Sequence, residues 1–600
     1  MNAKNITLII DGTKITVPEN YTIMQAGDSV NIRIPRLCYH SKLSQFGGCR
    51  ICIVEAEGAK NYLPACATQV REGMKIQTHS AGIRKSRRHI VELLLSNHDA
   101  RCQTCAKNGE CELQSLAEQM GIRDIPFEGE TKKFAIDDSS PSLVRDSQKC
   151  VLCGKCVRVC KEIQGVNALT FSHRGFKTNV VPAYNCQMAE SVCVNCGQCV
   201  NACPTGALIE RDYTSQVWDN LNNPQKTVIV QIAPAVRVAI GEMFGIKPGN
   251  DMTGEIVTAL RMLGFKVIFD TQFSADLTII EEGNELISRI KNGGKLPMFT
   301  SCSPGWIKFC EAFHPEFLDN ISTCKSPQQM MGTLIKTYYA RKAGLNPRNI
   351  YSVSIMPCLA KKFEAGRPEM NASGYQDVDA VLTTRELAKM IKQSGIDLGN
   401  LKKSEFDSPM GESTGAAPIF GATGGVMEAA LRTAYEVITG KELGDLNLKQ
   451  VRGMEGIRDA AIDIDGLKVN VAIAWGLANT HKLLTEIKSG KRQYHFVEIM
   501  TCPAGCLGGG GQPYMPNGIE YLDNAVYTNR ASGLYSIDEN KKIRKSHENP
   551  DIKKIYKDFL GEPLGKISHR LLHTHYHVRL PKGLPADTKE TVNLFNNQGA

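Results

Sequence analysis

The sequence predicts a multidomain protein that combines α+β modules with a larger α/β domain. The chain has 600 residues, more than one hydrophobic core ordinarily supports, and 42% of them are hydrophobic. Most of its 22 cysteines lie before residue 210 in short C-x2-C groups, whereas the later segments alternate apolar runs with helical periods. We therefore expect small metal-binding modules first and an α/β domain after them.

The charge and composition point away from several classes of protein. The formal net charge of +9 comes from 71 basic and 62 acidic residues spread along the chain, without a basic helix or an aromatic platform for nucleic acid. The first residues lack a charged stretch followed by an apolar one, and no apolar run reaches about 18 residues. We therefore expect a cytoplasmic protein that binds neither nucleic acid nor a membrane.

Residues 1–80 are predicted to form a β-rich module. The opening ITLIIDGTKITV predicts two strands around an Asp-Gly turn, and four cysteines follow in the spacing C-x10-C-x2-C-x13-C. This pattern resembles the plant-type 2Fe-2S ferredoxin-like (β-grasp) domain, in the variant spacing of respiratory NADH dehydrogenases, and implies one 2Fe-2S cluster. The alternative is four unrelated buried cysteines. The implied ligands are Cys38, Cys49, Cys52 and Cys66.

Residues 81–140 contain a histidine close to a second cysteine group, in the segment HDARCQTCAKNGEC. A lone histidine is usually structural, but this one lies four residues before a C-x2-C-x5-C pattern. The pattern resembles the 4Fe-4S module with one histidine ligand that follows the 2Fe-2S domain in the same enzymes. The implied ligands are His98, Cys102, Cys105 and Cys111.

Residues 141–220 contain an internal repeat of C-x2-C-x2-C-x3-C. In ferredoxins with two clusters, the fourth cysteine of each run binds the other cluster. The repeat predicts two 4Fe-4S sites, which brings the total to three accessory 4Fe-4S clusters and makes the first 210 residues an electron relay. Cys186 lies outside the pattern and is expected to be a packed thiol. The two predicted ligand sets are Cys150, Cys153, Cys156 and Cys203, and Cys193, Cys196, Cys199 and Cys160.

Residues 221–570 are predicted to form the α/β domain that uses these electrons. The apolar runs TVIVQIAP, KVIFDTQF, VSIMPC and DAVLTT alternate with helical segments such as TRELAKMIKQSG. Three loops, FTSCSPGW, IMPCLAKKFE and TCPAGCLGGGGQP, contain cysteine beside Gly, Pro or Lys and predict one metal pocket. A structural zinc site is the alternative, although it would not require the lysine or the four glycines. The four cysteines of these loops are Cys302, Cys358, Cys502 and Cys506.

These loops, together with the ferredoxin runs, resemble an FeFe-hydrogenase of the large clostridial type, from the first hairpin to about residue 570. The resemblance implies a two-lobed domain with an H-cluster, a 4Fe-4S cubane joined through one cysteine to a diiron unit with CO, cyanide and an azadithiolate. By resemblance, Cys506 matches the bridging thiolate, Cys358 and Cys502 match cubane ligands, and Lys361 matches the lysine that binds cyanide. Residues that match the lining of the diiron pocket are Ala233, Pro234, Gln328, Met356 and Met500.

The same resemblance implies a proton path through Glu282, Ser322, Glu285 and Arg289. Splitting H2 requires the movement of protons as well as electrons, so a carboxylate relay suits the chemistry. Without the resemblance, the segment ELISRIKNG would be interpreted as an amphipathic surface helix.

One loop departs from the family pattern. Two adjacent cysteines are usual, the first as a proton relay and the second as a cubane ligand, but here the loop is TSCSPGW. A strict alignment makes Cys302 the relay and Ser303 the ligand, whereas a shift by one residue reverses these roles. Serine is a harder and more basic ligand than cysteine. The sequence leaves both assignments open.

The remaining cysteines and histidines have weaker interpretations. Cys310 and Cys324 match no family ligand and are expected to be packed thiols. The segment HRLLHTHYHVRLPKG leads into a polar tail, residues 571–600, and is interpreted as a docking strand rather than a metal site. Its histidines are His569, His573, His575 and His577.

Several functions remain possible. No G-x-G-x-x-G loop follows a strand, so any NAD(P)H chemistry is expected to belong to a flavoprotein partner, together with a small 2Fe-2S subunit, in an electron-bifurcating complex. A stand-alone ferredoxin-dependent hydrogenase is the main alternative. A hydrogen sensor or an iron-sulfur assembly factor is less favoured. A subunit of an NADH or formate dehydrogenase would explain only the first 210 residues.

Overall fold

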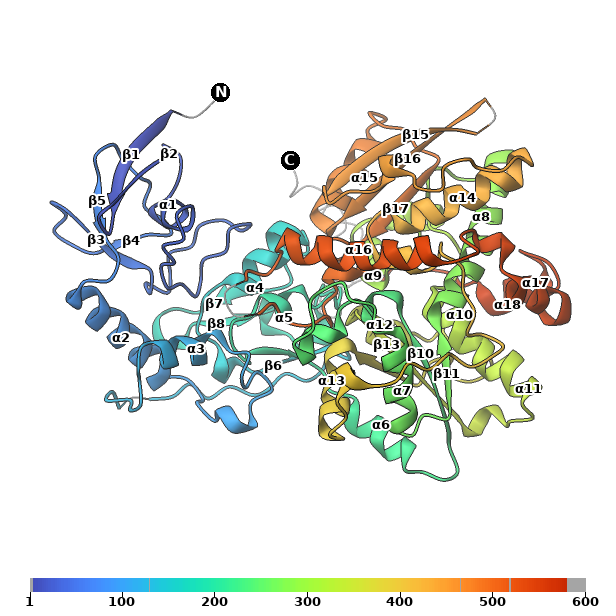
Figure 1. Ribbon diagram of the computed structural model, residues 1–600, viewed down its shortest axis with the longest axis horizontal. Helices are drawn as coiled ribbons and strands as arrows, with labels where there is room; N and C mark the ends of the chain where they lie inside the picture. The colour runs from blue at the N-terminus through green and yellow to red at the C-terminus, as the bar shows by residue number, and fades with distance from the viewer. Residues whose placement is uncertain (1–3, 129, 465, 517–518, 580–600) are drawn as a thin grey trace.

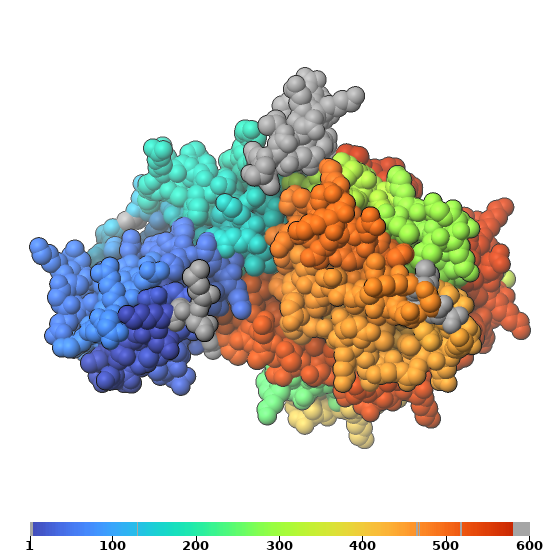
Figure 2. Space-filling model, turned by 90° about the horizontal axis from the view of Figure 1, so that it is seen from above, coloured from blue at the N-terminus to red at the C-terminus, as the bar shows by residue number. Residues whose placement is uncertain are grey.

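The chain forms a row of small modules that ends at a larger two-lobed domain (Figure 1). The computed structural model describes residues 4–128, 130–464, 466–516 and 519–579; most of the predicted tail, residues 580–600, lies outside the described residues. The space-filling view shows the N-terminal module at one end of the molecule (Figure 2), where Ser41 N–H donates to Glu520 of the catalytic half at 2.9 Å.

The N-terminal module is a five-stranded sheet that begins with the predicted hairpin. β1 (Asn5–Ile10) pairs antiparallel with β2 (Thr13–Pro18) through a turn at Asp11 and Gly12, both of which have positive φ. Such a turn matches the twist of the two strands. The sheet order is β2-β1-β5-β3-β4, with α1 (Ile23–Asp28) beside it. The remaining strands are β3 (Ile53–Ala56), β4 (Leu63–Pro64) and β5 (Lys75–Gln77).

Short helices dominate the next two modules. α2 (Ala81–Ser96) and α3 (Glu112–Gln119) contact each other around the histidine-containing module. The ferredoxin module contains α4 (Lys155–Arg158) and α5 (Gln198–Ala202), each of which starts after a left-handed glycine. Its strand pairs are β6 (Leu143–Arg145) with β9 (Leu208–Glu210), and β7 (Thr170–Ser172) with β8 (Asn179–Val181).

The first lobe of the catalytic domain is a parallel sheet covered on both faces. Its order is β11-β10-β13-β14, and its four strands fall on the four predicted apolar runs. α7 (Thr253–Met262) and α13 (Thr384–Gln393) pack on one face, and α8 (Thr271–Lys291) and α10 (Pro327–Leu334) on the other. The strands are β10 (Thr227–Ile232), β11 (Val267–Asp270), β13 (Ile350–Met356) and β14 (Ala380–Thr383).

The second lobe is a mixed sheet of order β12-β17-β16-β15, in which only β15 is antiparallel to its neighbour. Alternate residues of β16 face opposite sides: Val471 and Ile473 pack with α14 (Gly425–Thr439), and Ala472 packs with α9 (Pro304–Phe313) and α15 (Leu477–Lys488). The strands are β12 (Met298–Phe299), β15 (Ile457–Ile464), β16 (Leu467–Trp475) and β17 (Phe496–Met500).

The C-terminal helices α16 (Asn524–Asn540), α17 (Pro550–Ile555) and α18 (Lys566–Leu572) close the domain. In the segment expected as a docking strand, His569 lies in α18, and among the described residues from His573 onward the strand-like pairing is limited to an isolated bridge of His573 with Cys324 and the Thr574 N–H bond to the Thr323 carbonyl. None of the helices in the described part of the chain has the length and apolar character needed to cross a bilayer.

Candidate active site

The ends of parallel strands from both lobes meet at one cavity. Pro234 follows β10, Cys358 follows β13, Cys302 follows β12 and Cys502 follows β17. The carboxyl ends of parallel strands are the usual position of a binding crevice in such sheets. The empty space between the lining residues is about 830 Å³. The lining includes all of the predicted cubane and diiron-pocket residues: Ala233, Pro234, Cys302, Ser303, Gln328, Met356, Cys358, Lys361, Met500, Cys502 and Cys506.

The cysteines of this cavity suit a bulky metal cofactor. Burial raises the pKa of Cys506 to about 12 and that of Cys358 above its usual range, with Lys361 opposing the shift in both cases. Thiols that are buried this deeply become thiolates when a metal cation binds them. The glycine loop also has to be free of side chains, since a Cβ at Gly509 would lie 2.1 Å from the carbonyl oxygen of Pro357. The residues present therefore fit the iron-sulfur part of an H-cluster.

Lys361 reaches the cavity from the first turn of α12 (Ala360–Ala365). Its Nζ donates to both oxygens of Glu364, at 3.1 and 2.9 Å, and to the carbonyl oxygen of Cys302 at 3.1 Å. Glu364 also accepts from the amide of Gln328 at 3.0 Å and the hydroxyl of Ser326 at 2.9 Å. The carboxylate therefore fixes the position of two polar groups that face the cavity.

Cys302 and Ser303, whose roles the sequence left open, lie beside different groups. The Ser303 Oγ lies 2.8 Å from the hydroxyl of Thr501 and accepts the Thr501 N–H at 3.2 Å, beside Cys502. Burial raises the pKa of the Cys302 thiol well above its usual range, and the charge of Glu282 adds to the shift. Ser303 thus lies on the side of the cubane cysteines and Cys302 on the side of the carboxylate.

The four predicted proton-path residues lie in one connected group. The Ser322 Oγ donates to Glu285 Oε2 at 2.8 Å, and Arg289 Nη2 donates to Glu285 Oε1 at 2.6 Å. Burial raises the pKa of Glu282 to about 8, with the charge of Glu285 as a second cause and the Ser322 hydroxyl opposing it. A carboxyl with this pKa exchanges protons close to neutral pH. Of the segment ELISRIKNG, Glu285 and Leu286 are buried on α8, whereas the residues after them are half-buried or exposed.

The ferredoxin cysteines gather around two further cavities. One is lined by the first predicted set, including Cys203 from the second run, and the other by the second set, including Cys160 from the first run. Each fourth cysteine therefore lies with the opposite run, in the arrangement that the repeat predicts. The two sets are Cys150, Cys153, Cys156 and Cys203, and Cys160, Cys193, Cys196 and Cys199.

The two N-terminal cysteine groups also lie where they could hold metal. The Cys49 and Cys66 thiols lower the pKa of Cys38, and the Cys66 thiol lowers the pKa of Cys52, so the four thiols share one site. In the second module, burial lowers the pKa of His98 and keeps its ring neutral, as metal ligation requires. Its Nδ1 is buried without a hydrogen-bond partner among the described residues. The module's cysteines lie at a 3-10 turn (Cys102–Thr104) and just before α3, at Cys111.

The relay reaches the active site through a close backbone contact. Cys196 lines both the second ferredoxin cavity and the active-site cavity. Two residues later, Gln198 contacts the glycine loop, because its Nε2 donates to the Gly508 carbonyl at 3.0 Å. A Cβ at Gly510 would lie 2.4 Å from the carbonyl oxygen of Cys196. The last relay cluster would therefore lie next to the cubane position.

The sequence interpretation missed several residues of this region. Glu364 had a usable signal, because it lies three residues after Lys361 on the same helical face. Thr501 had none beyond its place before Cys502. Cys324 was interpreted as a packed thiol and is fully buried, but it lies beside Glu285 and His573, which the chain brings from distant positions.

Comparison with known families and proteins agrees with this geometry. The family described as the iron-only hydrogenase large subunit, C-terminal domain, matches residues 226–510, and the iron hydrogenase small subunit family matches residues 524–579. Residues 3–81 match a 2Fe-2S iron-sulfur cluster binding domain. Residues 87–126 match the iron-sulfur binding region of NADH-ubiquinone oxidoreductase G, and residues 149–207 match a 4Fe-4S dicluster domain.

The chain also resembles whole proteins. It is 48% identical to the NADP-reducing hydrogenase subunit HndD of Solidesulfovibrio fructosivorans, over 96% of this chain and 99% of that protein. It is 44% identical to iron hydrogenase 1 of Clostridium pasteurianum, over 95% and 99% of the two chains. The structure of the apo FeFe-hydrogenase from Chlamydomonas reinhardtii superposes with a TM-score of 0.54 at 43% identity, covering 62% of this chain and all of that one. With the iron-sulfur modules in front and the cysteine-lined cavity between its lobes, the chain belongs to the FeFe-hydrogenase large subunit family.

Proposed function

We propose that this FeFe-hydrogenase is the H2-reacting subunit of an NADP-linked, electron-bifurcating complex. The observation that carries the proposal is the row of N-terminal modules leading to the catalytic domain, with Cys196 lining both the second ferredoxin cavity and the active-site cavity, which suits electron exchange with a partner at the far end. The NADP-reducing relative is similar over nearly its whole length. Because no nucleotide-binding loop was found in the sequence, a flavoprotein subunit would handle NAD(P)H, helped by a small 2Fe-2S subunit.

The cofactor set that we propose is one 2Fe-2S cluster, three accessory 4Fe-4S clusters and an H-cluster. When bound, the H-cluster supplies an open iron site at which H2 is formed or split. Cys358, Cys502 and Cys506 would hold its cubane, and Lys361 would stabilise the cyanide charge. The apolar lining by Ala233, Pro234, Met356 and Met500 excludes water from the reacting centre.

The protein's own contribution to catalysis is the proton path. Cys302 would exchange the proton with the cofactor, Glu282 would accept or supply it, and Ser322 would pass it to Glu285. Arg289 holds the Glu285 carboxylate toward Ser322 through its 2.6 Å bond. The raised pKa of Glu282 makes both of its protonation states accessible near neutral pH.

For the contested loop, we propose that Ser303 is the fourth cubane ligand and Cys302 the relay. The hydrogen bonds between Ser303 and Thr501, beside Cys502, support this assignment. The test is Mössbauer spectroscopy of the cubane in the wild type, in Ser303→Cys and in Cys302→Ser. We expect Ser303→Cys to make the four iron sites more alike and Cys302→Ser to leave a full cubane. Loss of the cubane in Cys302→Ser would reverse the assignment.

The partner proposal is tested by gentle anaerobic purification of the native protein, followed by identification of the proteins that remain bound. We expect a flavoprotein and a small 2Fe-2S protein, and H2-dependent reduction of NADP+ together with ferredoxin. A chain that purifies alone and exchanges electrons only with ferredoxin would support the stand-alone alternative. The similarity to iron hydrogenase 1 over nearly its full length keeps that alternative open.

A further inference from the structure

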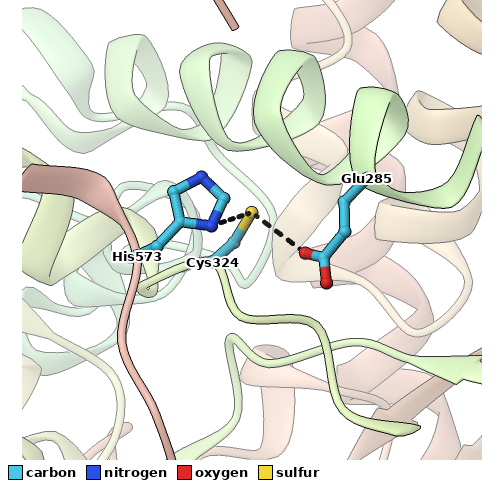
Figure 3. A group of neighbouring side chains, drawn as sticks. All are labelled: Glu285, Cys324 and His573. Atoms are coloured by element: carbon cyan, nitrogen blue, oxygen red, sulfur yellow. Dashed lines mark hydrogen bonds between the residues drawn. The ribbon is translucent and has the colours of Figure 1, made fainter. Parts of the chain in front are cut away.

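Three buried side chains outside the cofactor cavity converge beside the proton path (Figure 3). The Cys324 Sγ lies 3.8 Å from Glu285 Oε2 and 4.0 Å from His573 Nδ1, and all three atoms lie within 4.8 Å of one another. Backbone pairing holds the group together, because Cys324 and His573 form an isolated bridge and Thr574 N–H donates to the Thr323 carbonyl at 2.7 Å.

The histidine has the orientation of a metal ligand. Its Nε2 lies 3.1 Å from Glu281 Oε2, and Glu281 is itself fixed by the Tyr556 hydroxyl at 2.5 Å and the Leu564 N–H at 2.9 Å. With the Nε2 proton directed at this carboxylate, the Nδ1 lone pair accepts from the Thr323 hydroxyl at 2.8 Å and lies 4.0 Å from the Cys324 Sγ. Metal-binding histidines commonly donate their second N–H to a carboxylate, which orients the ring and raises its basicity.

The donor set selects one class of cation. A thiolate, an imidazole and a carboxylate suit Zn²⁺, whereas Mg²⁺ and Ca²⁺ prefer oxygen ligands alone. Tetrahedral Zn²⁺ would need these atoms about 3.3 to 3.7 Å apart, so a small contraction of the group is sufficient. The carboxylates of Glu281 and Glu285 lie close to Cys324, which favours a cation at this position. The Cys324 thiol would release its proton to solvent as the Zn–S bond forms.

We propose that Glu285, Cys324 and His573 form an inhibitory Zn²⁺ site, which blocks the proton path when it is occupied. The blocking rests on the proposed function, but the site does not. Glu285 Oε2 is the oxygen that accepts from Ser322 at 2.8 Å and also the oxygen that faces Cys324. A Zn–O bond at this atom therefore removes the acceptor that Ser322 needs to pass a proton outward. The hydroxyl of Thr323, a half-buried residue at the edge of the group, lies 2.8 Å from His573 Nδ1. It would have to rotate away before Zn²⁺ could bind this nitrogen.

The binding test uses the full chain with all its iron clusters, verified by iron content before and after treatment with Zn²⁺. The background is Cys186→Ala with His547→Gln, which removes a solvent-accessible thiol and the second candidate group, Glu436, His547 and Glu548. After desalting, we expect about one zinc per chain and a zinc X-ray absorption spectrum with one sulfur at about 2.3 Å. Absence of bound zinc would overturn the proposal.

Variants assign the sulfur and test the block. Cys324→Ala and the closer replacement Cys324→Ser should both lose the sulfur shell, whereas Cys310→Ala, at another buried thiol, should keep it. A sulfur shell that persists in both Cys324 variants overturns the site. Zn²⁺ should slow H2 evolution by roughly tenfold in the background protein. In each Cys324 variant, the rates of H2 evolution with and without Zn²⁺ should be about equal.

The two proposals fail in distinguishable ways. Zinc bound with the expected sulfur shell, in a protein that slows as predicted, supports both the site and the block. Zinc bound without any slowing overturns the block. If the loaded chain shows no H2 chemistry but binds zinc with the sulfur shell, the proposed function fails and the metal site stands.

Discussion

The relay half and the catalytic half of this molecule use buried ionisable groups differently. In the first 220 residues, each predicted cluster site is built from one or two short cysteine runs, and the side chains that line the two ferredoxin cavities are mainly cysteine and apolar. The catalytic half brings strand ends from two sheets together and adds buried carboxyls, such as Glu282 and Glu498, whose pKa burial raises to about 8 and about 7. The first arrangement suits the transfer of electrons, and the second also suits the transfer of protons.

The sharpest test of this division is Glu282→Gln. The amide keeps the size of the side chain but cannot carry the proton, so H2 evolution should fall by about 10² to 10⁴. The electron paramagnetic resonance signals of the relay clusters should remain unchanged. Glu412→Gln, at an exposed carboxyl, serves as the control and should retain full activity. A loss of relay signals in Glu282→Gln would contradict the separation of the two halves.

The same carboxyl predicts how stability depends on pH. The usual pKa of Glu282 is 4.5, and burial raises it to about 8 in the folded protein. Between these values the unfolded chain loses this proton and the folded chain keeps it, so stability falls as pH rises, by up to roughly 4 kcal/mol. The Glu282→Gln variant has no such proton, so its stability does not fall with pH for this reason. The melting temperature of the wild type should therefore fall relative to the variant between pH 5 and pH 8; parallel curves would refute the assignment.

Cys49→Ala addresses the opposite end of the molecule. Removing this predicted 2Fe-2S ligand should reduce H2-linked NADP+ reduction by on the order of tenfold, because electrons can no longer leave through the N-terminal module. Activity with a small artificial electron donor should change much less. Cys186→Ala is the matched control, since this cysteine lies outside all the predicted ligand sets. Equal losses with both electron carriers would place the exit elsewhere.

Gly510→Ala tests the junction between the halves and should have the smallest effect. The added Cβ would lie 2.4 Å from the Cys196 carbonyl, a distance that real Cβ atoms essentially never show, so the backbones of the glycine loop and the ferredoxin loop must move apart. We expect a loss of about 1 to 3 kcal/mol in stability and a few-fold slower partner-linked turnover. Gly444→Ala, which meets nothing within 4 Å, should behave like the wild type.

The two halves also differ in how far sequence alone describes them. The hairpin of β1 and β2 and the crossed ferredoxin sets follow from local spacing, which survives in any single sequence. The placement of Glu285 does not, because ELISRIKNG has the composition of a surface helix, and only the packing of α10 and α14 against α8 buries its first residues. The resemblance predicts Glu282 and Glu285 on one proton path, and in the structure both lie beside Ser322. The sequence had a local signal for Glu364, three residues after Lys361, but none for His573, whose contacts exist only after distant segments meet.

The C-terminal helices are continuous with the catalytic domain, although their sequence matches a family described as the hydrogenase small subunit. Tyr556, Leu564 and His573 all contact the Glu281 carboxylate on α8. A covalent tether gives such a segment a high effective concentration at its binding surface, whatever the dilution of the protein. The shell around Glu281 should therefore assemble equally well in scarce and in abundant enzyme, whereas the same helices on a separate chain would dissociate as the concentration falls.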